Sequence, residues 1–501
     1  MSMDYRKPFE HATPEETGVS SSLILEYIDN LERSQTEMHG LMIMRHNKMI
    51  TEGWWAPYGP NLRHGLQSHT KTYAATAVGI AYTEGILKLD ERVIDIFPEE
   101  APEEPSENLK LLTVRDVLCM GCGMDTMPWP SKDWIRDFLH TPVNHKPGTT
   151  YMYNSTGSTL LGAIVRAKTG LGLFDYLKPR LFDKIGINYD NLRCSCMPDG
   201  MEVGGGGMYA TTEDNFRLMK LYADGGVWEG ERILAEDYVK LATTNQNDSA
   251  TESINNPEAS DNFLGYGFQI CMCKPEKAYR ADGAMGQFTI VLPTLDMEIA
   301  ITETAVGAHW AQSTLNITWD FVEKITQSEA LPADHEAYDR LCRKLKRLNI
   351  GNPECQPFSP TAARIGGKKY KVTSGDLTPF GANFMTGDKA DGIDTFSLEF
   401  DDYGLVWNFV TRSGREEKIR FNTSGTRFSN LLGKKEDLTQ LYLGDAYWKD
   451  EDTLVMHGRW VETCIQDTYT LKFNGEELSV EPDNNSAFKF FKPDPIVIEK
   501  L

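Results

Sequence analysis

A nearly all-apolar segment between Thr70 and Glu84 constrains the fold of this chain more than any other feature of its sequence. Apolar residues occupy all sides of the helix that this segment predicts, and Gly85 follows where the helix should end. Such a helix has to be surrounded by other elements, because none of its faces can be left to water. We therefore predict a helix in the middle of a large folded domain.

The segments on both sides of this helix predict an antiparallel sheet with helices packed on it. The expected strands are Gly40–Arg45, Lys48–Trp54, Gly265–Ile270, Gln287–Leu292 and Met297–Thr302, and the expected outer helices are Ser20–Leu31 and Trp310–Ile325. His46-Asn47 suits a tight turn between the first two strands. Residues 90–214 mix helical segments such as Leu112–Leu118 and Ser158–Lys168 with proline and glycine turns, which predicts a mostly helical insertion. The first domain is thus expected to be α+β.

The pattern changes in the last third of the chain. A polar stretch and a charged helix, together residues 329–350, predict a linker helix after a first domain of residues 1–328. Beyond the linker, short alternating strands such as Thr395–Phe400, Leu405–Val410 and Thr468–Phe473 are separated by Gly, Asn and Asp turns. We predict an all-β accessory domain, a barrel or a sandwich-like fold, over residues 351–501.

The charge of the chain excludes some classes of partner. Its 501 residues carry a formal net charge of -22, which repels the phosphates of nucleic acids and anionic lipid headgroups. No apolar signal core follows Met1, and no run of residues is long and apolar enough to span a bilayer. We expect a cytoplasmic protein that binds neither nucleic acid nor membranes.

The cysteines predict thiols and not a disulfide framework, because nine is an odd number spread over a long chain. Cys119 and Cys122 have the C-x-x-C spacing that metal-ligating or redox thiols use. No second such pair and no histidine cluster accompanies them. We interpret the cysteines as structural and expect neither a metal nor another cofactor.

Ser68 and Lys71 form a Ser-x-x-Lys pattern at the start of the apolar helix. Residues three apart share a face of a helix, so the lysine amine comes within reach of the serine hydroxyl. Burial penalises the charged form of lysine and favours the neutral amine, which is able to take the serine proton. The pair predicts a nucleophilic serine with a lysine base, although the same four-residue pattern also arises by chance in a chain of this length.

Further motifs follow Ser68 and Lys71 in order along the chain. They are Leu112–Leu118, Pro147–Gly162, Gly204–Asp214, Leu221–Trp228 and Tyr279–Gln287. Over about residues 15–328 these motifs together resemble the penicillin-recognising serine hydrolases, which include class C β-lactamases, DD-peptidases and related esterases. The resemblance implies the serine β-lactamase/DD-peptidase-like fold, an acyl-enzyme on Ser68, and Tyr153 as a catalytic tyrosine that passes protons. The C-terminal domain resembles β-rich extensions seen behind such hydrolases.

Two positions depart from the pattern of these hydrolases. Ser155 stands where the Tyr-x-Asn motif has an amide, and Ala281 stands where the third motif has a cationic or imidazole side chain. Both departures argue against β-lactam hydrolysis. The resemblance implies an oxyanion hole made by the backbone N–H groups of Ser68 and Ala284. The expected oxyanion or substrate-binding residues are Ser155, Asp282, Gly283 and Ala284.

We expect a serine hydrolase that cleaves an ester or amide bond of a small molecule through an acyl-enzyme. Two alternatives stay open, namely transfer of the acyl group to an amine or alcohol, and a non-catalytic sensor or scaffold. A Ser-His triad is rejected, because adjacent helix positions such as Ser68 and His69 diverge and no G-x-S-x-G segment occurs. His69 is expected to line the pocket or to pack against the insertion. Three alternative roles stay open for the C-terminal domain, namely capping of the site, binding of a partner and formation of a homo-oligomer.

Overall fold

The computed structural model describes residues 6–34, 36–128, 131–249, 257–305, 311–325, 329–378, 391–432, 441–463, 465–475, 477–485 and 495–501. The chain divides into two compact units, Met1–Asn349 and Ile350–Leu501. The domain limits at residues 328 and 351 that we drew from the sequence stay predictions. Within the described ranges, no helix has the length and hydrophobicity needed to cross a membrane.

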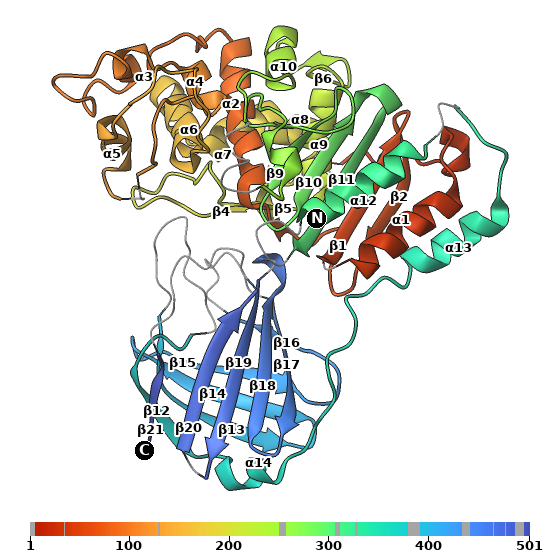
Figure 1. Ribbon diagram of the computed structural model, residues 1–501, viewed down its shortest axis with the longest axis vertical. Helices are drawn as coiled ribbons and strands as arrows, with labels where there is room; N and C mark the ends of the chain where they lie inside the picture. The colour runs from red at the N-terminus through yellow and green to blue at the C-terminus, as the bar shows by residue number, and fades with distance from the viewer. Residues whose placement is uncertain are drawn as a thin grey trace. The chain divides into compact units, whose positions relative to one another are not determined.

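Among the residues that the structure describes, the first unit is built on a six-stranded antiparallel sheet (Figure 1). In spatial order the strands are β2 (Lys48–Trp54), β1 (Thr36–Arg45), β11 (Met297–Ala305), β10 (Gln287–Leu292), β9 (Tyr279–Gly283) and β8 (Cys271–Met272). His46 and Asn47 have positive φ angles of 51° and 58°, as a two-residue hairpin turn requires. The predicted hairpin and the predicted strands that became β10 and β11 are confirmed.

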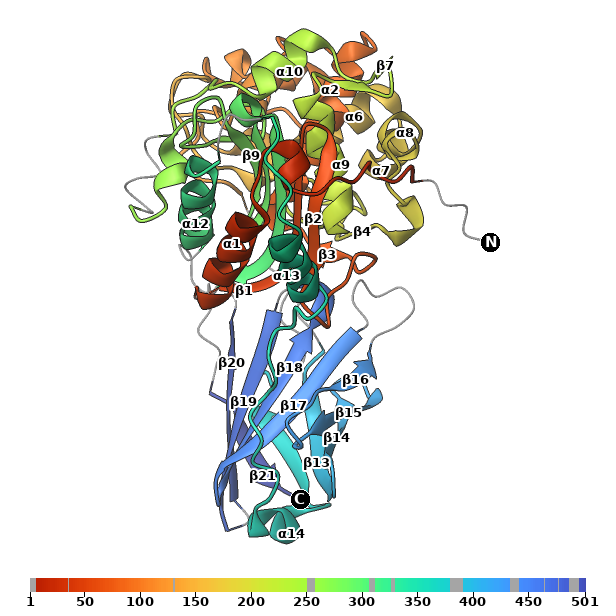
Figure 2. The same cartoon turned by 90° about the vertical axis from the view of Figure 1, so that its right-hand side faces the viewer.

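Helices cover both faces of this sheet (Figure 2). Helices α1 (Ser21–Arg33) and α12 (Ala311–Glu323) pack together on one face, and the buried residues of α1 recur at helical spacing along its inner side. Helix α9 (Thr212–Ala223) packs on the other face, against β1, β10 and β11. Helix α13 (His335–Leu345), which is the charged helix that we expected in the linker, contacts α1 and β2 inside the first unit.

The helical part of the first unit surrounds α2 (Thr70–Thr83), in which every residue from Thr70 to Ala81 is buried. Helix α2 packs against α6 (Ser155–Thr169). Gly79 leaves room for the ring of Tyr238, because a Cβ at Gly79 would lie 2.4 Å from that ring. The other helices are α3 (Val93–Ile96), α4 (Val114–Leu118), α5 (Trp134–His140), α7 (Leu173–Leu177), α8 (Asp183–Ile185) and α10 (Glu236–Ala242), and the short strands are β3 (His64–Gly65), β4 (Arg193–Cys194), β5 (Met208–Ala210), β6 (Val227–Trp228) and β7 (Glu231–Arg232). The predicted central helix and mostly helical insertion are confirmed.

Residues 265–270, which we predicted to be a strand, are not one. Only Tyr266 takes part in isolated bridges, and β8 begins after this segment. Gly265 and Gln269 have positive φ angles of 117° and 56°, which interrupts an extended backbone. The alternating apolar side chains are nevertheless buried, so the pattern that we interpreted as a strand reports a buried irregular segment.

The second unit is a single sheet that curves into a nearly closed barrel of ten strands within the described residues (Figure 1). The strands are β12 (Lys369–Ser374), β13 (Ile393–Asp401), β14 (Gly404–Thr411), β15 (Glu416–Asn422), β16 (Phe428–Leu431), β17 (Leu441–Asp450), β18 (Thr453–Trp460), β19 (Ile465–Asn474), β20 (Glu477–Asn484) and β21 (Val497–Lys500), and helix α14 (Pro360–Ile365) precedes them. Alternate residues of these strands form an aromatic core, in which the rings of Trp407 and Tyr469 meet at 5.2 Å. The predicted all-β accessory domain is confirmed.

Candidate active site

Ser68 lies in a single turn of 3₁₀ helix, η2 (Gln67–His69), that leads directly into α2. Gln67 has a φ of 50°, a left-handed conformation that costs a residue with a side chain about 1–2 kcal/mol. The next residue, Ser68, is half-buried, whereas the residues that follow it in α2 are buried. The strained turn therefore places the serine at the more exposed end of an otherwise enclosed helix.

Lys71 sits one turn further along α2 and is only 1% exposed. Its Nζ donates a hydrogen bond to Ser68 Oγ at 2.9 Å and a second one to the carbonyl of Gly205. Burial lowers the pKa of the Lys71 amine to about 7, while the nearby groups of Cys271 and Asp282 act in the opposite direction. A substantial fraction of this amine is therefore neutral near pH 7 and able to accept the serine proton.

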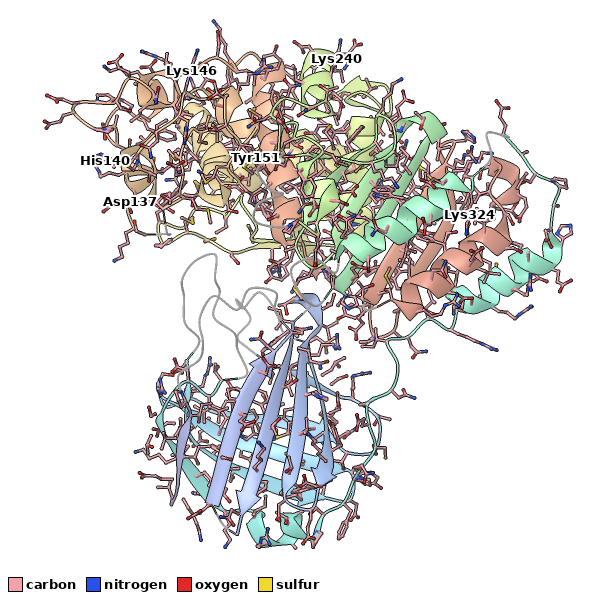
Figure 3. All side chains as sticks on the ribbon, viewed as in Figure 1. Asp137, His140, Lys146, Tyr151, Lys240 and Lys324 are labelled. Carbon is pink, nitrogen blue, oxygen red and sulfur yellow. The ribbon has the colours of Figure 1, made fainter. Side chains whose placement is uncertain are left out.

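Tyr153 lies beside this pair, with its ring centroid 4.8 Å from Lys71 Nζ. The segment that carries it is anchored by Tyr151, labelled in Figure 3, whose ring packs edge-on against that of Tyr266 at 5.6 Å. Asn154 then caps α6 by accepting a hydrogen bond from Gly157 N at 2.8 Å. This anchoring fixes Tyr153 at the start of α6, so the structure brings Ser68, Lys71 and the predicted catalytic tyrosine together.

Gly205 is a site residue that we did not predict. Its carbonyl accepts from Lys71, and its N–H donates to Thr159 Oγ1 at 3.0 Å. Thr159 in turn donates to the carbonyl of Ser155 at 3.0 Å, and a Cβ at Gly205 would lie 2.3 Å from that carbonyl. A chain of hydrogen bonds thus runs from the first turn of α6 to the lysine amine. The Gly204–Gly207 run was the available signal, but it did not indicate which carbonyl meets the lysine.

The end of β9, which precedes the predicted oxyanion donor Ala284, lies close to the segment before Ser68. A Cβ at Gly283 would lie 2.1 Å from the carbonyl oxygen of Leu66, so β9 approaches the segment before Ser68 as closely as backbone allows. Ala284 follows in the turn to β10. The backbone N–H groups of Ser68 and Ala284 donate no hydrogen bond to any residue that the structure describes. Two unused donors near the serine are what an oxyanion hole requires.

Asp282 lies one residue before Gly283, and its side chain is 26% exposed. Its Oδ2 accepts from Nε of Arg280 at 2.7 Å. Ser155, the other residue that we predicted to bind substrate, is half-buried and opens α6, and its carbonyl is part of the chain of hydrogen bonds to Lys71. Asp282 therefore lies on β9, which ends near Leu66, and Ser155 lies on α6, which packs against the helix that follows Ser68.

His69 and Gln269 support the site from behind. His69 is buried, and its Nε2 is 2.9 Å from Thr289 Oγ1 on β10, so it packs against the sheet and not against the insertion. Burial lowers the pKa of His69 to about 4, which keeps its ring neutral at pH 7. Gln269 accepts through its carbonyl from Thr72 at 3.0 Å and through its side chain from Ser158 at 2.7 Å, which joins α2 to α6. Gln269 is a further residue of the site that we did not predict, because no sequence pattern indicated its left-handed backbone.

The pair Cys119 and Cys122 consists of two buried free thiols, and burial raises the pKa of Cys119 to about 12. Such thiols stay protonated at neutral pH and are poor metal ligands. Across the described part of the chain, no group of three or more His, Cys, Asp or Glu side chains is arranged to hold a metal ion.

Comparison with known sequences identifies similar proteins. The profile of the family described as "Beta-lactamase" matches residues 28–318. The "6-aminohexanoate-dimer hydrolase" of Paenarthrobacter ureafaciens is 24% identical over 250 residues, which are 46% of this chain and 63% of that protein. The "Putative D-alanyl-D-alanine carboxypeptidase" of Escherichia coli K12 is 22% identical over 246 residues, 38% of this chain and 57% of that protein. The chain thus spans less than two thirds of the length of either curated relative.

Comparison with solved structures supports the same fold. The structure titled "Putative 6-aminohexanoate-dimer hydrolase from Bacillus anthracis" superposes with a TM-score of 0.51 and 18% sequence identity. The superposition covers 65% of this chain and 90% of that chain. At this identity the likeness concerns the fold alone.

Proposed function

The chain belongs to the Beta-lactamase family, and from this premise we propose that it is a serine hydrolase that cleaves an ester or amide bond of a small molecule through an acyl-enzyme on Ser68. The observation that carries the proposal is the 2.9 Å hydrogen bond between Lys71 Nζ and Ser68 Oγ, in a setting that lowers the lysine pKa to about 7. A serine hydroxyl needs such a neighbouring base, because it is a weak nucleophile at neutral pH.

In the proposed acylation step, neutral Lys71 takes the proton of Ser68 while Oγ attacks the substrate carbonyl. The carbonyl oxygen becomes an oxyanion, and we propose that the N–H groups of Ser68 and Ala284, which donate to no described residue, hold it. Cleavage of the bond to the leaving group then gives an ester of Ser68. The leaving alcohol or amine needs one proton, and Lys71 holds the one that Ser68 lost.

Tyr153 is proposed to carry that proton to the leaving group and, in the second half of the reaction, to accept one from water. The centroid of its ring lies 4.8 Å from Lys71 Nζ, and this proximity supports the proposal that phenol and amine exchange protons. Attack of the activated water on the acyl-enzyme releases the acid and returns the proton to Ser68. Each proton that leaves the serine is thereby restored within one turnover.

Labelling with a fluorophosphonate, which reacts with activated serines, tests the proposal. The wild type should gain the mass of one label on the peptide that contains Ser68, and Ser68→Ala should gain none. Ser22→Ala, a change at an exposed serine on α1, is the matched control and should label as the wild type does. Equal labelling of Ser68→Ala would refute the proposed nucleophile. Addition of alcohols and amines during turnover separates the alternatives, because acyl transfer yields a new ester or amide where hydrolysis yields only the acid.

We also propose a cytoplasmic location and self-association through the second unit. The described cysteines are free thiols, which favours a reducing compartment. Two of the exposed large apolar side chains, Phe428 and Leu431, lie on the short strand β16 of the second unit. Exposed apolar residues on such a strand favour contact with another chain.

A further inference from the structure

Strand β9 presents a carboxylate, and not a cation, next to the candidate nucleophile. Arg280 is 0% exposed, and its guanidinium is committed to Asp282, to the carbonyl of Met272 at 3.0 Å and to Asn262 Oδ1 at 2.8 Å. Ala281 is buried and has no charge to offer. The side chain of Asp282 is 26% exposed. A substrate that meets this strand therefore meets a carboxylate first.

The side chains of Arg280, Asp282 and Asp261 together carry a net negative charge. Asp261, which is 2% exposed, accepts hydrogen bonds from Gln312 Nε2 at 2.8 Å and Trp319 Nε1 at 3.1 Å, and its charge also acts on Arg280. Two carboxylates, Asp261 and Asp282, thus flank one guanidinium and leave an excess of one negative charge. The carboxylate of Asp261 is satisfied inside the protein, so the excess is available to a ligand only at Asp282.

The carboxylate of Asp282 is held in place through one of its two oxygens. Its Oδ2 accepts from the immobile Arg280, whereas Oδ1 accepts no hydrogen bond from the residues that the structure describes. A fixed carboxylate oxygen with open coordination is a strong acceptor for an ammonium group, because charge-assisted hydrogen bonds are among the strongest in proteins. The bond to Arg280 already orders the Asp282 side chain, so a ligand that binds to it loses little affinity to the entropy of ordering this side chain.

Asp282 is also close to the reacting groups. The next residue, Gly283, abuts the carbonyl of Leu66 two positions before Ser68. The negative charge of Asp282 is felt at Lys71 and at Tyr266, whose ring packs beside the segment of Tyr153. The strand that carries Asp282 therefore runs beside the segment that carries Ser68.

We propose that Asp282 is a specificity-determining residue that selects acyl donors carrying a protonated amine and disfavours donors carrying a carboxylate. This inference rests on the proposed hydrolase function and deepens it by naming the substrate class. The overall charge of -22 acts in the same direction, since it raises the local concentration of cations and lowers that of anions.

The test uses p-nitrophenyl esters of straight-chain ω-amino acids of increasing length. Each ester is paired with its N-acetyl counterpart, which is neutral, and with the half ester of a dicarboxylic acid of matching length, which is anionic. For the preferred length, kcat/KM of the wild type should be about tenfold higher for the amine than for the acetamide, and lowest for the carboxylate. In Asp282→Asn the ratio of amine to acetamide should fall towards one.

A merely structural role of Asp282 would give a different result. Loss of the Arg280 partner would then lower kcat/KM for the amine and the acetamide alike, and an unchanged ratio in Asp282→Asn overturns the inference. The matched control is Asp296→Asn, a change at an exposed carboxylate (68%) in the turn between β10 and β11, which should keep the wild-type ratio.

A measurement on the wild type covers the case in which Asp282→Asn does not fold. Raising the salt from about 0.01 M to about 1 M should reduce the preference for the amine, because screening weakens a partly exposed ion pair. A wild type that labels at Ser68 but shows no preference for the amine refutes the inference alone. A wild type that neither labels nor turns over any ester refutes the hydrolase proposal itself.

Discussion

The chemistry of Lys71 depends on its surroundings. An exposed lysine is almost fully protonated at pH 7 and has no lone pair to accept a proton. Burial in α2 removes water from the amine and lowers its pKa to about 7, while hydrogen bonds to Ser68 and Gly205 hold it in place. The nearby negative groups limit this shift, so the pKa stays in the range in which the amine both accepts and returns a proton.

The first prediction concerns the pH dependence of turnover. Because Lys71 has to be neutral, kcat/KM for a neutral ester should rise with pH and level off above an inflection near pH 7. Lys71→Arg should lower kcat/KM by about 10²–10⁴-fold at every pH, since a guanidinium does not give up its proton. Initial rates between pH 5 and 9, followed through the released p-nitrophenol with correction for its own ionisation, measure both effects.

Lys240→Arg is the control for this prediction, because Lys240 is an exposed residue of α10 (Figure 3). Its pH profile should superpose on that of the wild type. Wild-type activity in Lys71→Arg would show that the lysine is not the base, and an inflection that persists in that variant would assign the titration to another group.

At the scale of elements, the contact between β9 and η2 decides where the oxyanion donors lie. Gly283→Ala places a methyl group 2.1 Å from the carbonyl of Leu66, so strand and turn have to separate. We predict a loss of about 10²-fold in kcat, the size of effect seen when one oxyanion donor is removed, with a smaller change in KM. Steady-state kinetics on one ester and a melting curve measure activity and folding in parallel.

Gly59→Ala is the matched control for the loss of a glycine, because a Cβ at Gly59 meets nothing within 4 Å. It should keep the kcat of the wild type. If Gly283→Ala turned over at the wild-type rate while folded, the close approach of β9 to Leu66 would not matter for the reaction.

The same hairpin rests on a buried carboxyl group. Glu303 on β11 is 0% exposed and accepts from Thr314 Oγ1 at 2.9 and 2.8 Å, and a Cβ at Gly286 would lie 1.9 Å from its Oε1. Burial raises the pKa of Glu303 from 4.5 to about 8. The carboxyl is therefore largely protonated at neutral pH, and the turn that carries Ala284 lies against a neutral acid.

This group links stability to pH with a definite sign. Between about pH 4.5 and 8 the folded state holds a proton on Glu303 that the unfolded state has lost, so its contribution to the free energy of unfolding decreases as pH rises. The slope is about 1.4 kcal/mol per pH unit for one proton. We predict that Glu303→Gln, which keeps a neutral polar group, shows a shallower fall in stability from pH 5 to pH 8 than the wild type.

Denaturant unfolding at both pH values measures this difference. Glu276→Gln, at a side chain that is 78% exposed, should reproduce the wild-type dependence. An equal fall in stability for the wild type and Glu303→Gln would mean that Glu303 does not retain a proton in the folded state.

Local patterns account for the elements that were predicted correctly, and tertiary contacts account for the segment that was not. The hairpin at His46 and the helix after Ser68 were predictable, because turn chemistry and apolar spacing are written within about 15 residues. The loop of residues 265–270 was not, because Gln269 adopts a left-handed backbone to reach Ser158 and Thr72 from other elements. Alternating apolar residues fit both a strand and a buried loop, and only tertiary contacts separate the two.

At the scale of the whole molecule, the change of pattern between the two units and the order of the motifs were visible in the sequence. The residues that contact one another across long stretches of the first unit were not. Gly205 reaches Lys71 from 134 positions away, and Arg280 fixes Asp282 through residues of an adjoining loop. Such contacts depend on where each chain segment crosses the sheet, which residue types alone do not specify. Ser68, Lys71 and Tyr153 could be predicted to lie together only because the ordered motifs resemble those of a known family, and this resemblance supplies long-range information.

The last prediction concerns assembly. Leu431 on β16 is 82% exposed, and Phe428 on the same strand is 39% exposed, which is costly for an isolated chain in water. A second copy of this chain that covers β16 would remove this apolar surface from water. We predict that the wild type elutes with a mass above that of one 56.5 kDa chain and that Leu431→Lys shifts it to the monomer.

Light scattering coupled to size exclusion measures this mass directly. Leu111→Lys is the matched control, since Leu111 is a leucine of the first unit with 51% exposure and should leave the mass unchanged. Both variants should keep the esterase activity of the wild type, because neither residue belongs to the proposed catalytic machinery. A monomeric wild type would refute self-association, and an oligomer that survives Leu431→Lys but dissociates in Leu111→Lys would move the interface to the catalytic unit.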